Sequence, residues 1–221
     1  MDSKETLVIN FFAGAGAEKT TCAWEVAAEL KKLNIVAEYA SEYAKELVWD
    51  DRLDLLDGSY TNQTAMFDEQ KRRLDRLIGK VDVIVTDSPL LLQVAYIKEN
   101  KPEFERMAVQ AHSEYNNFNL FINRGRAYEQ EGRIHSLIES QKIDEDIKDI
   151  LSRNSIYFGN YYHITMPTVV ENIQVTLTKL KKSARMPMRE RLTAAKGKAQ
   201  LQETEESGEQ SRKGQVIGKD R

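Results

Sequence analysis

The sequence predicts a three-layer α/β domain, in which helices cover both faces of a five-stranded, mostly parallel sheet. Short apolar segments rich in β-branched and aromatic residues alternate along the chain with longer segments of helical periodicity. Strands that alternate with helices are joined by crossover helices and therefore run parallel. A chain of 221 residues, 41% of them apolar, is long enough for one such domain.

Each predicted strand is short and is bounded by glycine, proline or polar residues. The first, Thr6–Phe12, is a continuous apolar segment, which is typical of a strand buried on both faces. The other four are Ile35–Ala40, Val81–Thr86, Asn119–Asn123 and Tyr157–Thr165.

Helical periodicity occupies the segments between and after these strands. The first predicted helix, Thr20–Leu33, places Cys22, Val26 and Leu30 on one face. Trp24 and Trp49 are interpreted as core residues. The remaining predicted helices are Glu42–Trp49, Thr61–Ile78, Leu90–Lys98, Glu103–Tyr115, Ile134–Leu151 and Thr168–Lys181.

The composition changes near residue 182, which is the predicted end of the folded domain (residues 1–182). The last aromatic residue is Tyr162, and Glu, Gln, Lys, Ser and Gly dominate the final 26 residues. Such a segment buries too little apolar surface to fold alone. We therefore predict that residues 183–221 form a polar tail, disordered or partly helical; the alternative is a segment that binds a protein partner.

Charge and cysteine content exclude several classes of protein. A net charge of -3 gives no global attraction to nucleic acid or anionic membrane, so a nucleic-acid partner is not indicated. The single cysteine, Cys22, excludes an intrachain disulfide and multi-cysteine zinc sites, and fits a reducing cytoplasmic location. No apolar segment approaches the length of a membrane span.

A glycine-containing loop directly follows the first predicted strand and precedes the first helix. In this context the segment Ala13–Thr21, AGAGAEKTT, predicts a P-loop, whose backbone N–H groups bind phosphate at a helix N-terminus. Lys19 would reach the β and γ phosphates, and the Thr20 hydroxyl would bind Mg²⁺. The predicted nucleotide-binding residues are Gly14, Ala15, Gly16, Ala17, Lys19, Thr20 and Thr21.

Glu18 departs from the consensus G-x-x-x-x-G-K-[ST], as does Ala13, because both stand where the motif has glycine. A glutamate here is expected to repel phosphate and to strain a backbone position that favours glycine. Opposite charges about 4 Å apart attract by about 4 kcal/mol at an effective dielectric of about 20, so Glu18 would also neutralise Lys19. We therefore predict weakened nucleotide binding or impaired catalysis.

Two carboxylates follow predicted strands at the edge of the sheet where ligands bind in open α/β folds. Asp87 ends the strand Val81–Thr86 and is the candidate Mg²⁺ ligand, the alternative being a helix cap. Glu42 follows the strand Ile35–Ala40 and is the candidate general base for an acceptor hydroxyl. Its alternative role is a first-turn glutamate favoured by the helix dipole.

A charged loop with two glycines follows the fourth predicted strand and resembles a lid. Arg124, Arg126 and Arg133 lie in or beside it. Mobile arginines neutralise the charge that develops on the γ-phosphoryl group when such a lid closes. The alternative is a solvated loop. The histidines His112, His135 and His163 have no metal-ligand spacing and are expected to be structural or exposed.

The order of these motifs resembles one known family. The segments LVINFFAGAGAEKTT, SEYAKELVW, DVIVTDSPLLL and FNLFINRGRAYEQEGR are similar to the NadR-type AAA/P-loop kinases and ATPases. That family includes ribosylnicotinamide kinase domains and many phage proteins. The resemblance spans about residues 6–180, and the motifs in this order are fairly specific.

The resemblance implies a kinase-like P-loop NTPase fold, ATP and Mg²⁺ as cofactors, and γ-phosphoryl transfer to a nucleoside, nucleotide or related acceptor. It assigns phosphate and metal binding to Lys19 and Thr20, and the sheet-edge carboxylate to Asp87. Glu42 becomes the acceptor-side carboxylate, and Arg126 or Arg133 the lid arginine. A phage protein would act in the host cytoplasm. Two alternatives stay open: a non-catalytic binding or regulatory protein, and an NTPase that acts on a protein or nucleic-acid partner.

Overall fold

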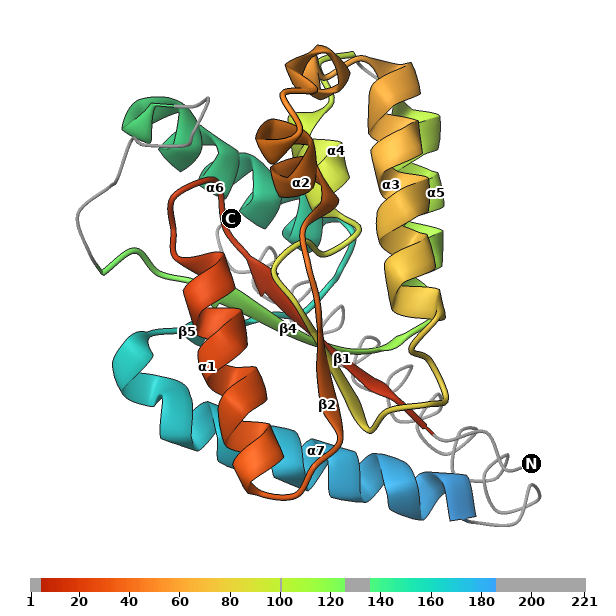
Figure 1. Cartoon of the computed structure of the whole chain (residues 1–221), viewed down its shortest axis with the longest axis vertical. Helices are drawn as coiled ribbons and strands as arrows, with labels where there is room; N and C mark the ends of the chain where they lie inside the picture. Colours follow the sequence, from red (N-terminus) through yellow and green to blue (C-terminus); the bar gives the residue numbers. More distant parts are fainter. Residues whose placement is uncertain (1–4, 100, 126–135, 186–221) are drawn as a thin grey trace, which may run out of the picture. The chain divides into compact units, whose positions relative to one another are not determined.

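The structure is a computed structural model that describes residues 5–99, 101–125 and 136–185. It contains a five-stranded sheet in the order β2-β3-β1-β4-β5, and every pair of neighbouring strands is parallel. Helices lie on both sides of the sheet (Figure 1). The predicted three-layer α/β fold is therefore confirmed.

The strands are shorter than the sequence pattern predicts, except at β4. Residues predicted as the later part of the fifth strand instead form a 3₁₀ turn, η2 (His163–Thr165), because the Thr165 hydroxyl accepts from the Tyr162 N–H at 3.1 Å. The strands are β1 (Leu7–Phe12), β2 (Ala37–Ala40), β3 (Val83–Thr86), β4 (Asn116–Ile122) and β5 (Gly159–Tyr161).

Each predicted helix is present, with ends that differ by a few residues. Side-chain caps fix two of the starts: Ser59 accepts from the Asn62 N–H, and Ser136 forms a capping box with Glu139. The helices are α1 (Lys19–Lys32), α2 (Tyr43–Trp49), α3 (Tyr60–Asp75), α4 (Leu92–Tyr96), α5 (Pro102–Ser113), α6 (Leu137–Arg153) and α7 (Met166–Arg185), with a 3₁₀ turn η1 (Leu53–Leu56).

Helices cover both faces of the sheet. Figure 1 shows α1 and α7 on one side, and α3, α4, α5 and α6 on the opposite side. Because side chains alternate along a strand, Val8 and Phe12 of β1 point to the same face and join a core cluster with residues of α3, α4, α5 and α6. Both faces of β1 are buried, as its continuous apolar sequence predicts.

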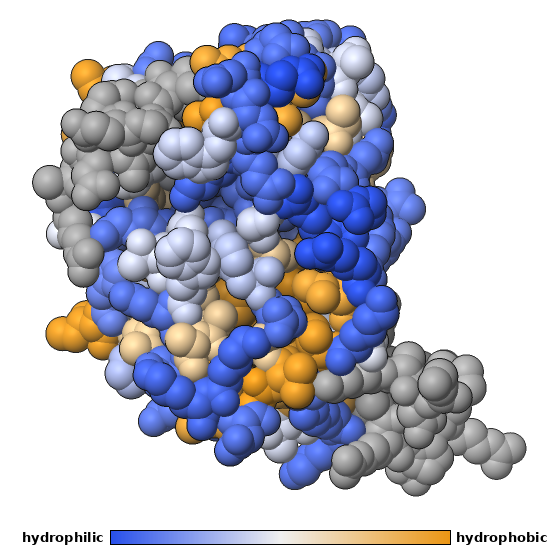
Figure 2. All heavy atoms as spheres, viewed as in Figure 1, coloured by the Kyte–Doolittle hydropathy of each residue, from blue (hydrophilic) through white to orange (hydrophobic). Residues whose placement is uncertain are grey.

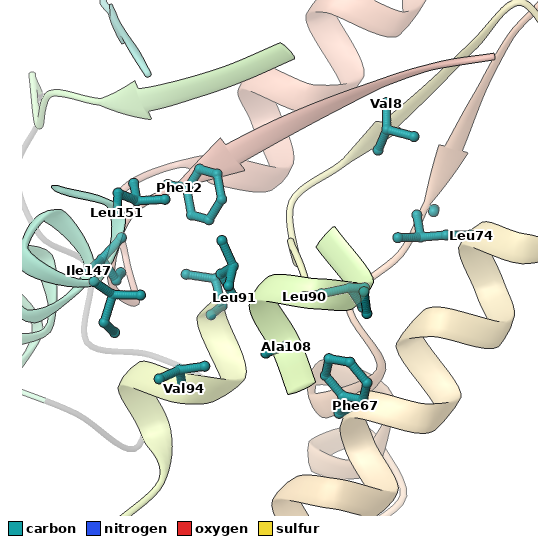
Figure 3. Close-up of a cluster of buried hydrophobic side chains, with 14 of the residues drawn as sticks. Val8, Phe12, Phe67, Leu74, Leu90, Leu91, Val94, Ala108, Ile147 and Leu151 are labelled. Atoms are coloured by element: carbon teal, nitrogen blue, oxygen red, sulfur yellow. The ribbon is translucent and has the colours of Figure 1, made fainter. Parts of the chain in front are cut away.

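This core cluster joins the sheet to α3, α4, α5 and α6. Figure 3 shows Phe12 of β1 between Leu91 and Leu151, so this strand, the segment before α4 and α6 meet at one point. Phe67 of α3 stacks edge to face on Phe104 of α5, with ring centroids 5.8 Å apart. Burying side chains of this size contributes about 1.5–3 kcal/mol each.

Two tryptophans predicted to lie in the core are exposed. Trp24 is 57% exposed and Trp49 is 72% exposed. Each occupies the outer side of its helix, where small or polar neighbours complete the solvent face. Leu33 and Val36, at the turn between α1 and β2, are also nearly half exposed. Figure 2 shows apolar surface on this face of the molecule near the lower ends of α1 and β2.

The chain divides into a compact unit of residues 1–177 and a second unit of residues 178–221. In the second unit, the structure describes only the end of α7. The predicted tail lies outside the described residues from position 186 onward. No helix within the described ranges is long and apolar enough to cross a membrane.

We expect Leu90→Ala to lower the free energy of unfolding by about 2–5 kcal/mol, because Leu90 is 1% exposed and its removal leaves a cavity. Leu53→Ala is the matched control, because Leu53 is 53% exposed, and it should change stability by less than about 0.5 kcal/mol. Urea denaturation of both variants measures the difference. Equal losses would contradict the assignment of Leu90 to the core.

Burial of His112 predicts a loss of stability in mild acid. Its side chain is 5% exposed and packs against the Phe12 ring, and burial lowers its pKa from 6.5 to about 4. The unfolded chain therefore takes up this proton first, so the stability is present above pH 6.5 and is lost as the pH falls toward 4. Between pH 7 and pH 5 the loss from His112 should be about 2 kcal/mol.

Urea denaturation at both pH values, on the wild type and on His112→Gln, isolates this contribution. The variant should lose about 2 kcal/mol less than the wild type over the same interval, because glutamine does not titrate. Parallel losses in the two proteins would show that His112 does not titrate as its burial requires.

Candidate functional site

The phosphate loop lies between the end of β1 and the start of α1, at the carboxyl edge of the sheet. Gly16 has a φ of 68° and Glu18 a φ of 61°, so the loop turns twice through the left-handed region. Glu18 is the N-cap of α1, so the helix and its free N–H groups begin at Lys19. This arrangement presents backbone donors and the positive end of the helix dipole to an anion.

The strain predicted at Glu18 is confirmed by its left-handed backbone. A residue with a Cβ atom in this region costs about 1–2 kcal/mol relative to the right-handed conformation. The loop therefore keeps the backbone path of the glycine-containing motif even though glycine is absent from this position. The Glu18 carboxylate contacts His163, with Oε2 3.2 Å from Nε2.

Lys19 is largely buried at the first position of α1. Its Nζ donates to the carbonyl oxygen of Gly14 at 3.0 Å, across the loop that joins β1 to α1. Only 8% of the residue is exposed. The ammonium group therefore lies inside the curve of the loop, where a bound phosphate would replace its contact with Gly14.

Asp87, at the end of β3, is the centre of a buried polar cluster. Its Oδ2 accepts from the Thr20 hydroxyl at 2.6 Å and from the Tyr39 hydroxyl at 2.7 Å. The other oxygen, Oδ1, is buried and has no hydrogen-bond partner among the described residues. A buried carboxylate oxygen without a partner is costly, so the cluster is suited to receive a cation or a donor.

These residues fit a magnesium ion. Mg²⁺ takes oxygen ligands and is usually held by one or two protein groups together with phosphate and water. The Thr20 hydroxyl and Asp87 Oδ1 are oxygen groups of this kind and would be the residues to hold the ion. Within the described ranges, no three or more His, Cys, Asp or Glu residues group together in a way that could hold a metal ion.

Glu42, at the N-cap of α2, belongs to the same site. Burial raises the pKa of its carboxyl group, the nearby Lys19 ammonium partly offsets this effect, and the negative charge of Asp87 adds to it. Glu42 follows the end of β2, and β2 pairs in parallel with β3, so Glu42 and Asp87 lie at the same edge of the sheet. Burial, and next the charge of Asp87, also raise the pKa of Tyr39, so its hydroxyl stays protonated and donates to Asp87.

A second set of contacts holds the loop from the side of α6. Asp144 accepts from the Gly14 N–H at 2.6 Å and from Arg124 Nε at 2.6 Å. Arg124 also donates to the Ala15 carbonyl at 3.0 Å, and the Ser140 hydroxyl donates to the same carbonyl oxygen. Arg124 thus anchors the loop rather than reaching freely over it as a lid residue would.

The structure brings most of the sequence-predicted site residues together. Lys19, Thr20, Asp87 and Glu42 meet at one edge of the sheet. Gly14, Ala15, Gly16 and Ala17 form the loop, and Thr21 occupies the exposed side of the first turn of α1. The two predicted lid arginines, Arg126 and Arg133, lie outside the described residues.

Four residues that contact the site were not singled out as functional by the sequence. Tyr39 contacts Asp87, Ser140 and Asp144 support the loop, and His163 contacts Glu18. Ser140 and Asp144 are buried polar residues on the same side of α6. Polar residues that interrupt the apolar stripe of a helix could have indicated, from the sequence, that this side of α6 makes polar contacts. For His163 the sequence contained no signal, because its partner is 145 residues away.

The parallel sheet, the loop at its carboxyl edge and the Lys19–Thr20–Asp87 cluster define a P-loop nucleotide-binding domain with a kinase-like fold. The chain belongs to the AAA domain family, whose model matches residues 8–172. No curated protein sequence matched the chain.

One solved structure with a TM-score above 0.5 has the same fold. The NadR protein in complex with NR superposes with a TM-score of 0.61 at 17% identity, covering 77% of this chain and 52% of the NadR chain. This chain therefore spans about half the length of that protein. Kti12 from Chaetomium thermophilum in complex with ADP-AlF3 is more remote, with a TM-score of 0.44 at 14% identity over 78% of this chain and 98% of Kti12.

We expect Gly14→Ala to destabilise the protein by about 1–3 kcal/mol through overpacking. An added Cβ would lie 2.5 Å from the Ser140 carbonyl oxygen, which belongs to the backbone of α6 and cannot move aside. Gly125→Ala is the matched control, because its Cβ would meet nothing within 4 Å. Thermal unfolding compares the two variants, and a loss at Gly14 no larger than that at Gly125 would contradict this close packing.

Proposed function

We propose that this protein binds ATP with Mg²⁺ and transfers the γ-phosphoryl group to a nucleoside, nucleotide or related small-molecule acceptor. The observation that carries the proposal is the convergence of Lys19, Thr20 and Asp87 beside the N-terminus of α1. These are the groups that a kinase needs for the phosphates and for the metal ion.

Each group has a distinct role in this proposal. The N–H groups of the loop and of the first turn of α1 bind the β and γ phosphates, and Lys19 exchanges its contact with the Gly14 carbonyl for a phosphate oxygen. Thr20 and Asp87 hold Mg²⁺, which when bound neutralises charge on the phosphates. Tyr39 fixes Asp87 so that Oδ1 stays available.

Glu42 is the proposed acceptor-side base. Its raised pKa makes it a better proton acceptor than an exposed carboxylate, while the nearby Lys19 favours its charged form. Glu42 follows β2, which pairs in parallel with β3, the strand that leads to Asp87. Arg126 and Arg133 remain the proposed lid arginines, which would neutralise charge on the transferred group when the lid closes.

The acceptor class rests on the likeness to NadR, whose solved structure contains NR. A shared fold with a nucleoside-type complex supports, for this chain, an acceptor that is a nucleoside, a nucleotide or a similar small molecule. The proposed location is the cytoplasm, where such acceptors and ATP are present, or the host cytoplasm if the gene belongs to a phage.

The left-handed glutamate in the loop favours a second candidate function. Glu18 and Ala13 replace both glycines of the motif, and a carboxylate near the phosphates opposes their binding. The second candidate is a protein that keeps the fold for binding or regulation without turnover. An NTPase that acts on a protein or nucleic-acid partner, with a protein contacted through the segment 183–221, is the remaining alternative.

The test is phosphate transfer from radiolabelled Mg-ATP to a panel of nucleosides, nucleotides and DNA ends, using the wild type and Glu18→Gly. We expect a labelled nucleoside-type product with both proteins, and a higher rate with Glu18→Gly. Lys19→Ala and Asp87→Asn should each lower the rate about 100–1,000-fold, because each removes a charge that stabilises the transition state.

Lys32→Ala is the control, because it removes a lysine from the opposite end of α1, where the side chain is 68% exposed. Its rate should stay within about threefold of the wild type. Binding of Mg-ATP without product from any acceptor would favour the non-catalytic function. Absence of binding even in Glu18→Gly would contradict the proposal as a whole.

A further inference from the structure

The side chain of Glu18 lies along the flank of α1, and not over the end of the helix where phosphate binds. Its carboxylate contacts His163, and the same imidazole contacts two further groups of α1. Nδ1 of His163 lies 3.3 Å from Glu25 Oε2, and Nε2 lies 3.8 Å from Cys22 Sγ. Residues 18, 22 and 25 follow at helical spacing, so all three share one side of the first two turns.

The position of Glu18 in the chain makes this orientation important. Glu18 is the N-cap of α1, next to the N–H groups at the start of the helix, so a carboxylate turned toward them would lie in the proposed phosphate site. There its charge would compete with a phosphate for the same donors and for Lys19. An attractive contact on the flank of the helix opposes that placement.

His163 is itself held in place by the segment that follows β5. Two hydrogen bonds between Tyr162 and Thr165 close the turn η2. The Thr165 N–H donates to the Tyr162 carbonyl oxygen at 2.8 Å, and the Tyr162 N–H donates to the Thr165 hydroxyl at 3.1 Å. The neighbouring Tyr161 is fully buried and stacks edge to face on Phe11 of β1, with ring centroids 5.2 Å apart. The imidazole therefore projects from a fixed turn toward α1.

We propose that His163 is a positioning residue that holds the Glu18 carboxylate away from the phosphate-binding groups, so that the loop binds nucleotide despite its glutamate. The imidazole lies between the Glu18 and Glu25 carboxylates and contacts both, with Nε2 3.2 Å from Glu18 and Nδ1 3.3 Å from Glu25. The inference rests on the proposed nucleotide binding. It adds a residue that compensates for the departure from the P-loop consensus.

A double-mutant cycle on the affinity for Mg-ATP, measured by calorimetric titration, tests this role. His163→Ala should raise the Kd about tenfold in the wild-type protein, because the released carboxylate then faces the phosphates. In the Glu18→Gln background the same change should alter the Kd by less than twofold. Glutamine keeps the size and the left-handed backbone of Glu18 but has no charge to hold away.

A purely structural role for His163 predicts a different result, namely the same loss of affinity in both backgrounds, and that result would overturn the inference. No loss in either background would overturn it too. Ile164→Ala is the matched control: Ile164 is the next residue in the same turn and is 90% exposed, so its removal should leave the Kd unchanged. If His163→Ala does not fold, His163→Asn serves instead, since it is polar but too short to reach Glu18.

Glu18→Gly separates this inference from the proposed function. If that variant does not bind Mg-ATP, nucleotide binding itself is wrong. If it binds, and the cycle between residues 18 and 163 shows no coupling, nucleotide binding stands and only the role of His163 is wrong.

Discussion

The hydrogen bond from the Thr20 hydroxyl to Asp87 joins the start of α1 to the end of β3, across 67 residues of sequence. It forms because β1 and β3 are parallel neighbours, so the chain leaves both strands at the same edge of the sheet. Tyr39 reaches the same carboxylate from β2, the next strand along. Among the described residues, Lys19, Thr20 and Asp87, which are proposed to act on phosphate or metal, lie at or beside this contact.

The phosphate loop is supported from both sides, which explains how it keeps its path with few glycines. On one side Asp144 and Arg124 hold Gly14 and Ala15 against α6. On the other side His163 contacts Glu18. A motif with more glycine would tolerate the same path with less help, because glycine enters the left-handed region without steric cost. Here tertiary contacts offset that cost.

The fold was predictable because its signals are local. Continuous apolar strands such as β1 and amphipathic helices such as α6 are recognisable from residue spacing alone. The ends of the helices and of β5 were predicted less accurately. In particular, the Tyr162–Thr165 turn replaces the end of the strand predicted there. Trp24 and Trp49 were wrongly assigned to the core, because aromatic character does not say which side of a helix faces the sheet.

For the site, the sequence alone determined the residues that belong to a motif: Lys19 and Thr20 after a buried strand, and carboxylates after two others. It also predicted the backbone strain at Glu18, which depends only on local geometry. Only the tertiary structure decided where the Glu18 carboxylate lies, and that His163 contacts it. The physical reason is range: backbone preferences act within a few residues, whereas the direction of a charged side chain depends on partners that folding brings from distant parts of the chain.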